Sequence, residues 1–426
     1  MSSIIWRGRP GVVVRESESG VSVEYAGNRI LLSRLTAGQA GALARLMNGG
    51  STEQTLTDLV AGEGMPALAE WHWQVGMLGR LRAIEWVAME GDRETGRLVP
   101  LGARFEPDFG GFDPTAGHRF STYAFIRWDG AQWTIESPLA EARVEVPGGD
   151  PPVLAGSLLL LLHAGGMLAA GDEAAEAAGW SFHDALFHFR SRMGRRDDAW
   201  GARPDADPPV PLPRVVAYDP ERRIGLAKPP LTPNGGPSFT EVLEGRRSRR
   251  RYGSSPIEAD ELGEFLFHVA ADRVVADTVR RTYPSGGACY PLEIYAVIAR
   301  GGGIPPGAYH YDPDGHALDP VVGAAESVDG LLRWYRGKAG DDEIQVLLLI
   351  TLVPERVNRR YDAIGYSLAL KEVGALFQSA YLVASAMGLS ACALGGGDSD
   401  TAARTLGLDP LLEPVIGEFL IASGPA

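Results

Sequence analysis

The chain has 426 residues, which is longer than one ordinary domain and favours two or three. Its formal charge is −14, from 40 Lys and Arg against 54 Asp and Glu, and this balance argues against nucleic-acid binding through a broadly basic face. Hydrophobic residues make up 45% of the chain, which is ample for a packed core. Because only two cysteines are present, a disulfide scaffold and a Cys-rich zinc module are excluded, and no metal site is predicted.

The longest apolar stretch of the sequence, residues 153–170, contains five consecutive leucines. It approaches membrane-spanning length, but His163 and the Gly165-Gly166 pair interrupt it, and no basic anchor flanks it. The first 16 residues lack the continuous apolar stretch of a signal peptide. We therefore expect 153–170 to form a buried helix in a cytoplasmic protein that has no membrane partner.

Two modules with a similar order of elements are expected in the first half of the chain, at residues 1–95 and 96–200. In the first module, two strands are predicted at 21–25 and 29–32, and a returning strand at 84–89. Capping boxes that open helices are predicted at Thr36–Gln39 and Ser51–Gln54, and a third helix is predicted at 67–81. In the second module, strands are predicted at 122–128 and 132–136, the leucine-rich helix at 153–170, and a final helix at 181–189.

Two strands followed by three short helices resemble a winged-helix arrangement. Such modules often bind DNA, but the acidic balance argues against DNA here. A second use is peptide capture, in which an extended segment adds to an exposed strand edge and lies against a helix. A third possibility is that the modules only brace the rest of the chain.

The composition changes after a linker. Residues 201–238 are rich in Pro, Asp and Gly, which is typical of a semi-extended linker. In the remaining segment, residues 239–426, the predicted strands are 292–299, 308–311, 317–318, 345–353, 390–394 and 415–422, and the predicted helices are 260–270 and 365–387. Strands mixed with a long central helix predict an α+β domain.

A dense run of arginines lies near the start of this domain, with five arginines between Arg246 and Arg251. Like charges at this spacing repel one another unless an anion lies between them. The planar guanidinium group donates hydrogen bonds in a fork that suits phosphate oxygens. The run therefore indicates either a phosphate site or a solvated basic edge.

Two glycine motifs lie next to predicted strands. Residues 283–291 carry Gly286-Gly287 directly before a strand, and Gly395–Gly397 follow the strand at 390–394. Glycine lets the backbone approach a flat ligand closely and aim its N–H groups at it. Each motif alone is equally compatible with an ordinary tight turn.

In this order the three features resemble the nitroreductase-like flavoproteins, and most closely their branch of SagB-type thiazole/oxazole-forming peptide dehydrogenases (azoline oxidases). The resemblance covers about residues 239–426. The matching motifs are Arg246-Arg247-Ser248-x-Arg250-x-Tyr252, Pro284-Ser285-Gly286-Gly287, Pro291–Tyr295, Gly307–Asp312, Glu372-x-Gly374 with Gln378, and Gly388-Leu389. Residues 180–194 also resemble this branch, whose N-terminal half is thought to hold winged-helix peptide clamps.

The resemblance implies FMN as the cofactor, a homodimer with the flavin at its interface, and oxidation of peptide thiazolines or oxazolines to azoles. The FMN phosphate and ribityl chain would be held by Arg246, Ser248 and Arg250, with Arg247 as a lesser contributor. The isoalloxazine ring would be bordered by Pro284, Ser285 and Gly286. Backbone N–H groups near the flavin N5 and O4 edge, where negative charge grows as hydride arrives, would come from Gly395, Gly396 and Gly397. Glu372 would lie under the flavin or make a polar contact inside its helix.

One departure from the family concerns the proton chemistry. The family carries a Lys-Tyr pair before the long helix, and the corresponding residues here are Arg360 and Tyr361. Aromatisation removes a proton from one ring carbon and a hydride from its neighbour, and a neutral lysine can take that proton whereas arginine stays protonated. Tyr361 is then the candidate base, and Arg360 is the cation that helps a phenol of pKa ~10 to ionise. Alternatively, Arg360 replaces a lysine that served only as a positive charge, or the reaction differs.

The sequence therefore predicts an FMN-dependent oxidoreductase that aromatises azoline rings of a peptide in natural-product biosynthesis and passes the electrons to oxygen. The alternative enzyme is a nitroreductase-like oxidoreductase that acts on another peptide or on a small molecule. A third possibility is a non-catalytic, peptide-binding scaffold in a complex with a cyclodehydratase. Flavin bound without azoline turnover favours the second possibility. The sequence specifies neither the azoline nor a leader peptide.

Overall fold

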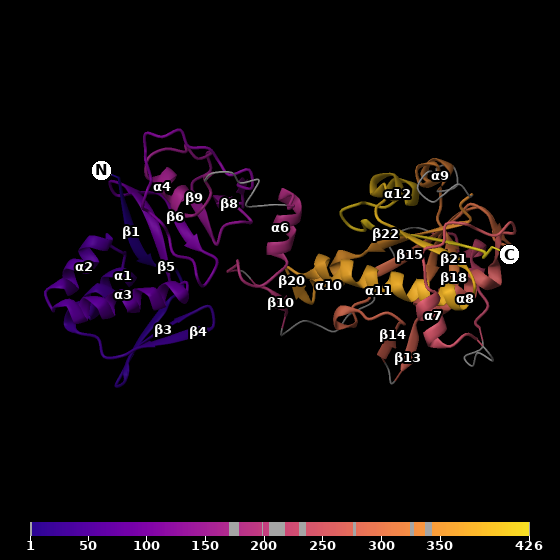
Figure 1. The fold of residues 1–426 in the computed structure, drawn as a ribbon, viewed down its shortest axis with the longest axis horizontal. Coiled ribbons are helices and arrows are strands. Elements are labelled where there is room, and N and C mark those ends of the chain that lie inside the picture. Colours follow the sequence, from indigo (N-terminus) through magenta and orange to yellow (C-terminus); the bar gives the residue numbers. More distant parts are fainter. Residues whose placement is uncertain are drawn as a thin grey trace. The chain divides into compact units, whose positions relative to one another are not determined.

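The computed structural model describes residues 2–169, 179–197, 199–203, 218–229, 236–275, 278–323, 328–336 and 343–425. The chain divides into two compact units, Met1–Asp198 and Ala199–Ala426, and each has its own core (Figure 1). Of the linker expected at 201–238, residues 204–217 and 230–235 lie outside the described residues. The remainder of that linker includes two short strands of the second unit, at 201–202 and 224–225.

The first unit contains two antiparallel sheets. Its strands are β1 Ser2–Gly8, β2 Val13–Ser17, β3 Gly20–Tyr25, β4 Asn28–Leu32, β5 Ile84–Glu90, β6 Arg93–Pro100, β7 Phe125–Trp128, β8 Gln132–Glu136 and β9 Ala142–Pro147. Its helices are α1 Ala37–Met47, α2 Glu53–Ala61, α3 Met65–Arg80, α4 Ser157–Ala164 and α6 Phe182–Arg190. The sheet orders are β1-β5-β6-β9-β8-β7 and β2-β3-β4.

The expected boundary between two N-terminal modules at residues 95 and 96 falls inside strand β6. Strands from both expected modules also join in the same six-stranded sheet. One apolar core extends from the helices α1–α3 to α4, with Trp71, Leu98 and Leu161 among its buried members. The two-module division and the winged-helix resemblance are therefore not confirmed, and both stay predictions.

The two capping boxes predicted in the first unit have different outcomes. The predicted capping box at Thr36 is confirmed, because the Thr36 side chain accepts from the Gln39 N–H while the Gln39 side chain accepts from the Thr36 N–H. The predicted box at Ser51 is wrong, since α2 is capped by Thr52. The backbone of Ser51 instead exchanges two hydrogen bonds with Trp6, which places Ser51 before the helix.

The leucine-rich stretch forms a short buried helix. Helix α4 ends at Ala164, and Leu158, Leu161 and Leu162 are buried. Residue 170 of the predicted range lies outside the described residues. Within the part of the chain that is described, no helix is both long and apolar enough to span a bilayer.

The second unit is built on a seven-stranded antiparallel sheet with the order β11-β18-β17-β15-β19-β22-β21. Its strands are β11 Ile224–Gly225, β15 Leu292–Ile298, β17 Gly307–Asp312, β18 Ala317–Pro320, β19 Val346–Leu352, β21 Ser390–Leu394 and β22 Val415–Ala422. Smaller paired strands are β10 Gly201–Ala202, β12 Ile257–Glu258, β13 Arg273–Val275, β14 Thr278–Arg280, β16 Gly301–Gly302 and β20 Tyr361–Asp362. All the strands predicted in this unit are confirmed to within one or two residues.

Helices cover both faces of this sheet. They are α7 Phe239–Gly245, α8 Ala259–Ala270, α9 Val328–Arg336, α10 Pro354–Asn358, α11 Gly365–Ala386 and α12 Ser399–Leu406, with 3₁₀ turns at Pro220–Arg222 and Gly286–Ala288. Alternate residues of β15 enter two separate cores: Ile294 packs with residues of α8 and α11, and Val297 packs with residues of α9 and α12. The predicted α+β architecture is confirmed, and α11 is the central helix beside the sheet.

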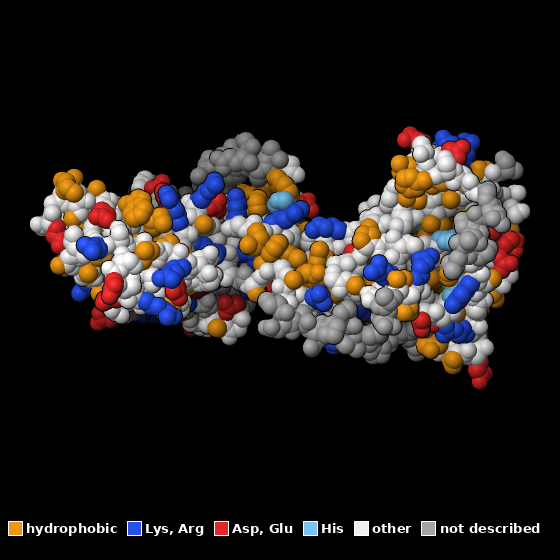
Figure 2. Space-filling view, turned by 90° about the horizontal axis from the view of Figure 1, so that it is seen from below, with side chains coloured by type: hydrophobic (Ala, Val, Ile, Leu, Met, Phe, Trp, Pro, Cys, Tyr) orange, Lys and Arg blue, Asp and Glu red, His pale blue; other side chains and the backbone are white. Residues whose placement is uncertain are grey.

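The molecular surface carries charges of both signs. On the face drawn in Figure 2, basic side chains are scattered among acidic and apolar ones over both units and do not merge into one continuous basic surface. This distribution agrees with the acidic composition of the chain.

Candidate active site

The predicted phosphate-binding segment follows helix α7 directly. Ser238 begins α7 with a capping box, and Arg246 ends it. The chain then runs beside α11 and β21, because the Arg249 N–H donates to the Ala391 carbonyl (2.8 Å). The Ser248 hydroxyl shares a hydrogen bond with the Tyr381 hydroxyl of α11 (2.8 Å). The segment is therefore fixed to the sheet edge and to the central helix.

The arginines of this segment are available to an anion. The Arg246 guanidinium carbon lies 5.1 Å from the centre of the Tyr381 ring, in a cation–π contact. Arg247 and Arg250 are exposed. Among the described residues, no carboxylate forms an ion pair with Arg246, Arg247 or Arg250. Unneutralised guanidinium groups next to one another fit a phosphate.

The glycine triplet follows β21 and leads into α12. The Tyr381 hydroxyl accepts from the Ala393 N–H (2.7 Å), so the same tyrosine holds both the arginine segment and the end of β21. A Cβ added at Gly395 or Gly396 would meet no atom within 4 Å, and both glycines are exposed. A Cβ at Gly397 would collide with the Glu418 carboxylate. The backbone at 395 and 396 thus borders open space.

The second glycine motif forms a tight loop over α11. The Gly286 N–H and the Ser285 hydroxyl both donate to Oε1 of Glu372, at 2.8 and 3.0 Å. The Ser285 hydroxyl also accepts from the Tyr290 N–H (2.8 Å). Burial raises the pKa of the Glu372 carboxyl, and the hydrogen bonds from Gly286 and Ser285 limit that rise. Glu372 is therefore the polar contact of its helix with this loop.

Arg360 and Tyr361 lie against the same loop. A Cβ added at Gly287 would lie 2.5 Å from Nε of Arg360 and 2.9 Å from the Tyr361 hydroxyl. The backbone of the pair is held by the short strand β10, since Ala202 pairs with Tyr361 and the Arg203 N–H donates to the Arg360 carbonyl (2.8 Å). The structure thus brings the predicted catalytic pair next to the predicted flavin-bordering loop.

A buried triad formed by Glu293, His310 and Arg356 lies behind this loop, and sequence reasoning did not find it. Nε2 of His310 donates to Glu293 (2.6 Å), and Arg356 forms an ion pair with the other oxygen of Glu293. Burial alone would raise the pKa of Glu293, but the His310 hydrogen bond and the Arg356 charge lower it to about 2. Arg356 also donates to the Tyr290 carbonyl (3.2 Å). Its members come from β15, β17 and α10, so no local motif reveals the triad.

The predicted site residues form two groups along α11. Glu372 belongs to the group with the loop and the Arg360-Tyr361 pair, and Tyr381 belongs to the group with the arginine segment and β21. Glu372 and Tyr381 are nine positions apart in α11, which is about 14 Å along the helix axis. In the described part of this chain, no hydrogen bond or ion pair joins one group to the other.

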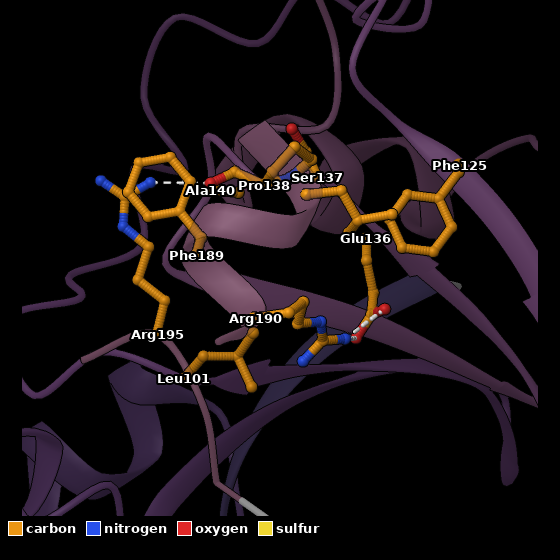
Figure 3. A pocket seen from close by; sticks show the side chains of 10 residues that line it. Leu101, Phe125, Glu136, Ser137, Pro138, Ala140, Phe189, Arg190 and Arg195 are labelled. Carbon is orange, nitrogen blue, oxygen red and sulfur yellow. Dashed lines mark hydrogen bonds and ion pairs between the residues drawn. The ribbon is translucent and has the colours of Figure 1, made fainter. Parts of the chain in front are cut away.

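The first unit contains a separate small cavity between α6 and the strands β7 and β8 (Figure 3). Phe125 and Phe189 contribute its apolar walls, and Arg190 forms a two-bonded ion pair with Glu136 (2.5 and 2.6 Å). Its volume is about 20 Å³, which is room for about one water molecule. This cavity is too small to hold a substrate side chain in the present conformation.

Comparisons with known proteins identify relatives of the second unit. The sequence profile of the Nitroreductase family matches residues 243–423. MJ1384 of Methanocaldococcus jannaschii, a protein named as a nitroreductase, is 36% identical over 159 residues, which are 36% of this chain and 77% of MJ1384. The microcin B17-processing protein McbC of Escherichia coli is 33% identical over 152 residues, which are 33% of this chain and 54% of McbC.

Among the solved structures that match is a microcin synthetase complex. It is the E. coli microcin synthetase McbBCD with truncated pro-MccB17 bound, with 26% identity, a TM-score of 0.36, and coverage of 46% of this chain and 76% of that chain. The chain spans about half the length of McbC, and the match agrees with the SagB-type resemblance expected from the motifs. The identity to MJ1384 over most of that protein, together with the profile match, shows that this chain belongs to the nitroreductase family.

Proposed function

We propose that the chain is an FMN-dependent dehydrogenase that oxidises thiazoline or oxazoline rings of a peptide to thiazoles or oxazoles. One observation carries the proposal: the Arg360-Tyr361 pair lies against Gly287, in the loop expected to border the flavin. A proton acceptor next to a hydride acceptor is the arrangement that azoline aromatisation needs. Similarity to a microcin-processing protein supports a peptide as the substrate.

The residues present suit FMN. Exposed arginines without carboxylate partners in the described chain would bind its phosphate, and Ser248 would bind the ribityl chain beside them. Open space beside Gly395 and Gly396 leaves room for the flavin edge, toward which their N–H groups would donate. When bound, FMN supplies a two-electron hydride acceptor.

The protein side chains handle the proton. Tyr361 would act as a phenolate that the charge of Arg360, which stays protonated, stabilises; it would take the proton from the azoline carbon and become a neutral phenol. Pairing with β10 holds the backbone of both residues in place. Electrons taken from the ring would pass to oxygen.

We further propose that the active enzyme is a homodimer. The loop group and the arginine group are anchored at Glu372 and Tyr381, about 14 Å apart along the axis of α11 and two and a half turns apart, which is on opposite faces of the helix. A flavin bound to one chain's arginines would therefore be bordered by the loop of a second copy. Tyr366 and Leu370 of α11 are exposed apolar side chains that a second subunit would cover.

The first unit is proposed to hold the peptide in the cytoplasm, alone or with a cyclodehydratase. In the described chain, β7 lies at the edge of the six-stranded sheet, with Ile126 and Trp128 exposed. Helix α6 packs beside it, since the rings of Phe125 and Phe182 are 5.8 Å apart. A free strand edge next to a helix suits an added peptide strand.

Mass spectrometry of an azoline-containing peptide incubated with the FMN-loaded protein and oxygen tests the proposal. The expected result is a loss of about 2 Da per ring, one hydride and one proton. Tyr361→Phe should abolish this loss while FMN stays bound. Bound flavin without any azoline oxidation would instead favour an oxidoreductase for another substrate, and a wild-type protein that binds no flavin would favour the peptide-binding scaffold.

A further inference from the structure

The loop 284–290 has a strained backbone that needs outside support. Ala288 and Tyr290 have φ values of 55° and 42°, in the left-handed region that residues with a Cβ avoid, and Gly287 has a φ of 60°. Each such residue other than glycine costs about 1–2 kcal/mol relative to ordinary backbone. A loop of this shape persists only where its surroundings hold it.

Glu372 supplies that support through a single carboxyl oxygen. Its Oε1 accepts from the Gly286 N–H and from the Ser285 hydroxyl, and the same hydroxyl accepts from the Tyr290 N–H. The two ends of the strained stretch are therefore tied to one atom of α11. The Glu372 side chain is only 5% exposed, and its other oxygen is buried without a hydrogen-bond partner.

A second element holds the far end of the loop. Arg356 of α10 donates to the Tyr290 carbonyl and is itself fixed by its ion pair with Glu293. The backbone of Tyr290 is thus held at both of its polar groups: its N–H is bound through Ser285 and Glu372, and its carbonyl is bound by Arg356. Between these anchors lies Gly287, against which Arg360 and Tyr361 pack.

We infer that Glu372 is a positioning residue: it holds loop 284–290 in the one conformation that borders the flavin and seats the Arg360-Tyr361 pair. The inference rests on the proposed function for the identity of the cofactor. It assigns Glu372 the role of a hydrogen-bond acceptor and not of an acid or base. Since only Oε1 is used, a glutamine at this position should perform the same task.

The test compares Glu372→Gln, Glu372→Ala and Ser285→Ala in the full chain. Glu413→Ala is the matched control, because Glu413 is also a buried carboxyl of this unit that accepts two side-chain hydroxyl groups, from Tyr295 and Thr351. The first readout is hydrogen exchange of segment 284–290 in the protein without FMN. The second readout is the FMN dissociation constant from flavin fluorescence.

The expected result is faster exchange of the loop in Glu372→Ala and Ser285→Ala, and FMN binding that is weaker by about tenfold in Glu372→Ala, which corresponds to ~1.4 kcal/mol. Glu372→Gln should stay within about threefold of the wild type, a difference below ~1 kcal/mol. Glu413→Ala should change neither the hydrogen exchange of the loop nor the FMN dissociation constant. If Glu372→Ala does not fold, Ser285→Ala gives the same comparison without altering the helix.

Three results would overturn the inference: wild-type loop exchange in both alanine variants, an equal change in Glu413→Ala, or a Glu372→Gln variant as defective as Glu372→Ala. A failure of the proposed function would give different results from a failure of the role inferred for Glu372. A wild-type chain that binds no FMN would end that proposal, and hydrogen exchange would then decide the role of Glu372 by itself. A chain that binds FMN but leaves azolines unchanged also leaves the loop comparison intact.

Discussion

Gly287→Ala should reduce azoline oxidation more than it reduces stability. The added Cβ would lie 2.5 Å from Nε and 2.6 Å from Cδ of Arg360. Ordinary carbon contacts are about 3.5–4.0 Å, so the Arg360 side chain must move by about 1 Å. Its long side chain can do so at little energetic cost, but a misplacement of that size at a reacting centre costs up to ~100-fold in rate. The stability cost is the left-handed strain of alanine, about 1–2 kcal/mol.

The assay combines azoline turnover with thermal unfolding. We expect turnover to fall roughly ten- to a hundredfold, and the melting temperature to fall by about 2–4 °C for each kcal/mol lost. Gly407→Ala is the control, because Gly407 has a φ of 68° and a Cβ there would meet nothing within 4 Å. It should lose similar stability and keep its turnover. Wild-type turnover in Gly287→Ala, or an equal loss in Gly407→Ala, would refute the reasoning.

Three further outcomes are expected. Arg250→Glu should weaken FMN binding roughly 10–100-fold, as read from flavin fluorescence, since it removes a charged hydrogen-bond donor; Arg15→Glu, on an exposed strand of the first unit, should bind FMN normally. Arg360→Lys should change the pH–rate profile on its alkaline side, because an amine can lose its proton, and with it the positive charge that favours the Tyr361 phenolate, whereas a guanidinium cannot; a profile identical to that of the wild type would contradict a role for this charge. The free energy of unfolding should fall as the pH drops from about 4.5 to about 2, because the folded state lowers the pKa of Glu293 and the stabilisation is present above the unfolded pKa. Between pH 5 and pH 3, urea denaturation should show a loss of stability that is smaller by about 2 kcal/mol in Glu293→Gln than in the wild type.

The local pattern of apolar residues, glycines and charges was sufficient to predict most of the strands and helices of the second unit. The apolar runs at 346–352 and 390–394 are strands because both of their faces are buried, and a buried strand reads as a continuous apolar stretch. The glycine motifs and the arginine run stood out because few residue types tolerate those backbone shapes or charge densities. Helix starts were predictable where the cap uses only local atoms, as at Thr36, and failed at Ser51, whose backbone bonds to distant Trp6.

The partners of the site residues were decided only by the tertiary structure. The sequence by itself predicted an α+β domain that resembles flavoproteins, and it predicted that Arg360, Tyr361 and the loop 284–287 belong to one site. It did not show that residues 201–203 pair with the Arg360-Tyr361 segment, or that Glu372 holds the loop. The physical reason is that hydrogen-bond acceptors are chosen by proximity in the folded chain, and Glu372 lies 86 residues from the amide it binds. Periodicity and spacing report which face of an element is buried, and they carry no information about which buried polar groups will meet there.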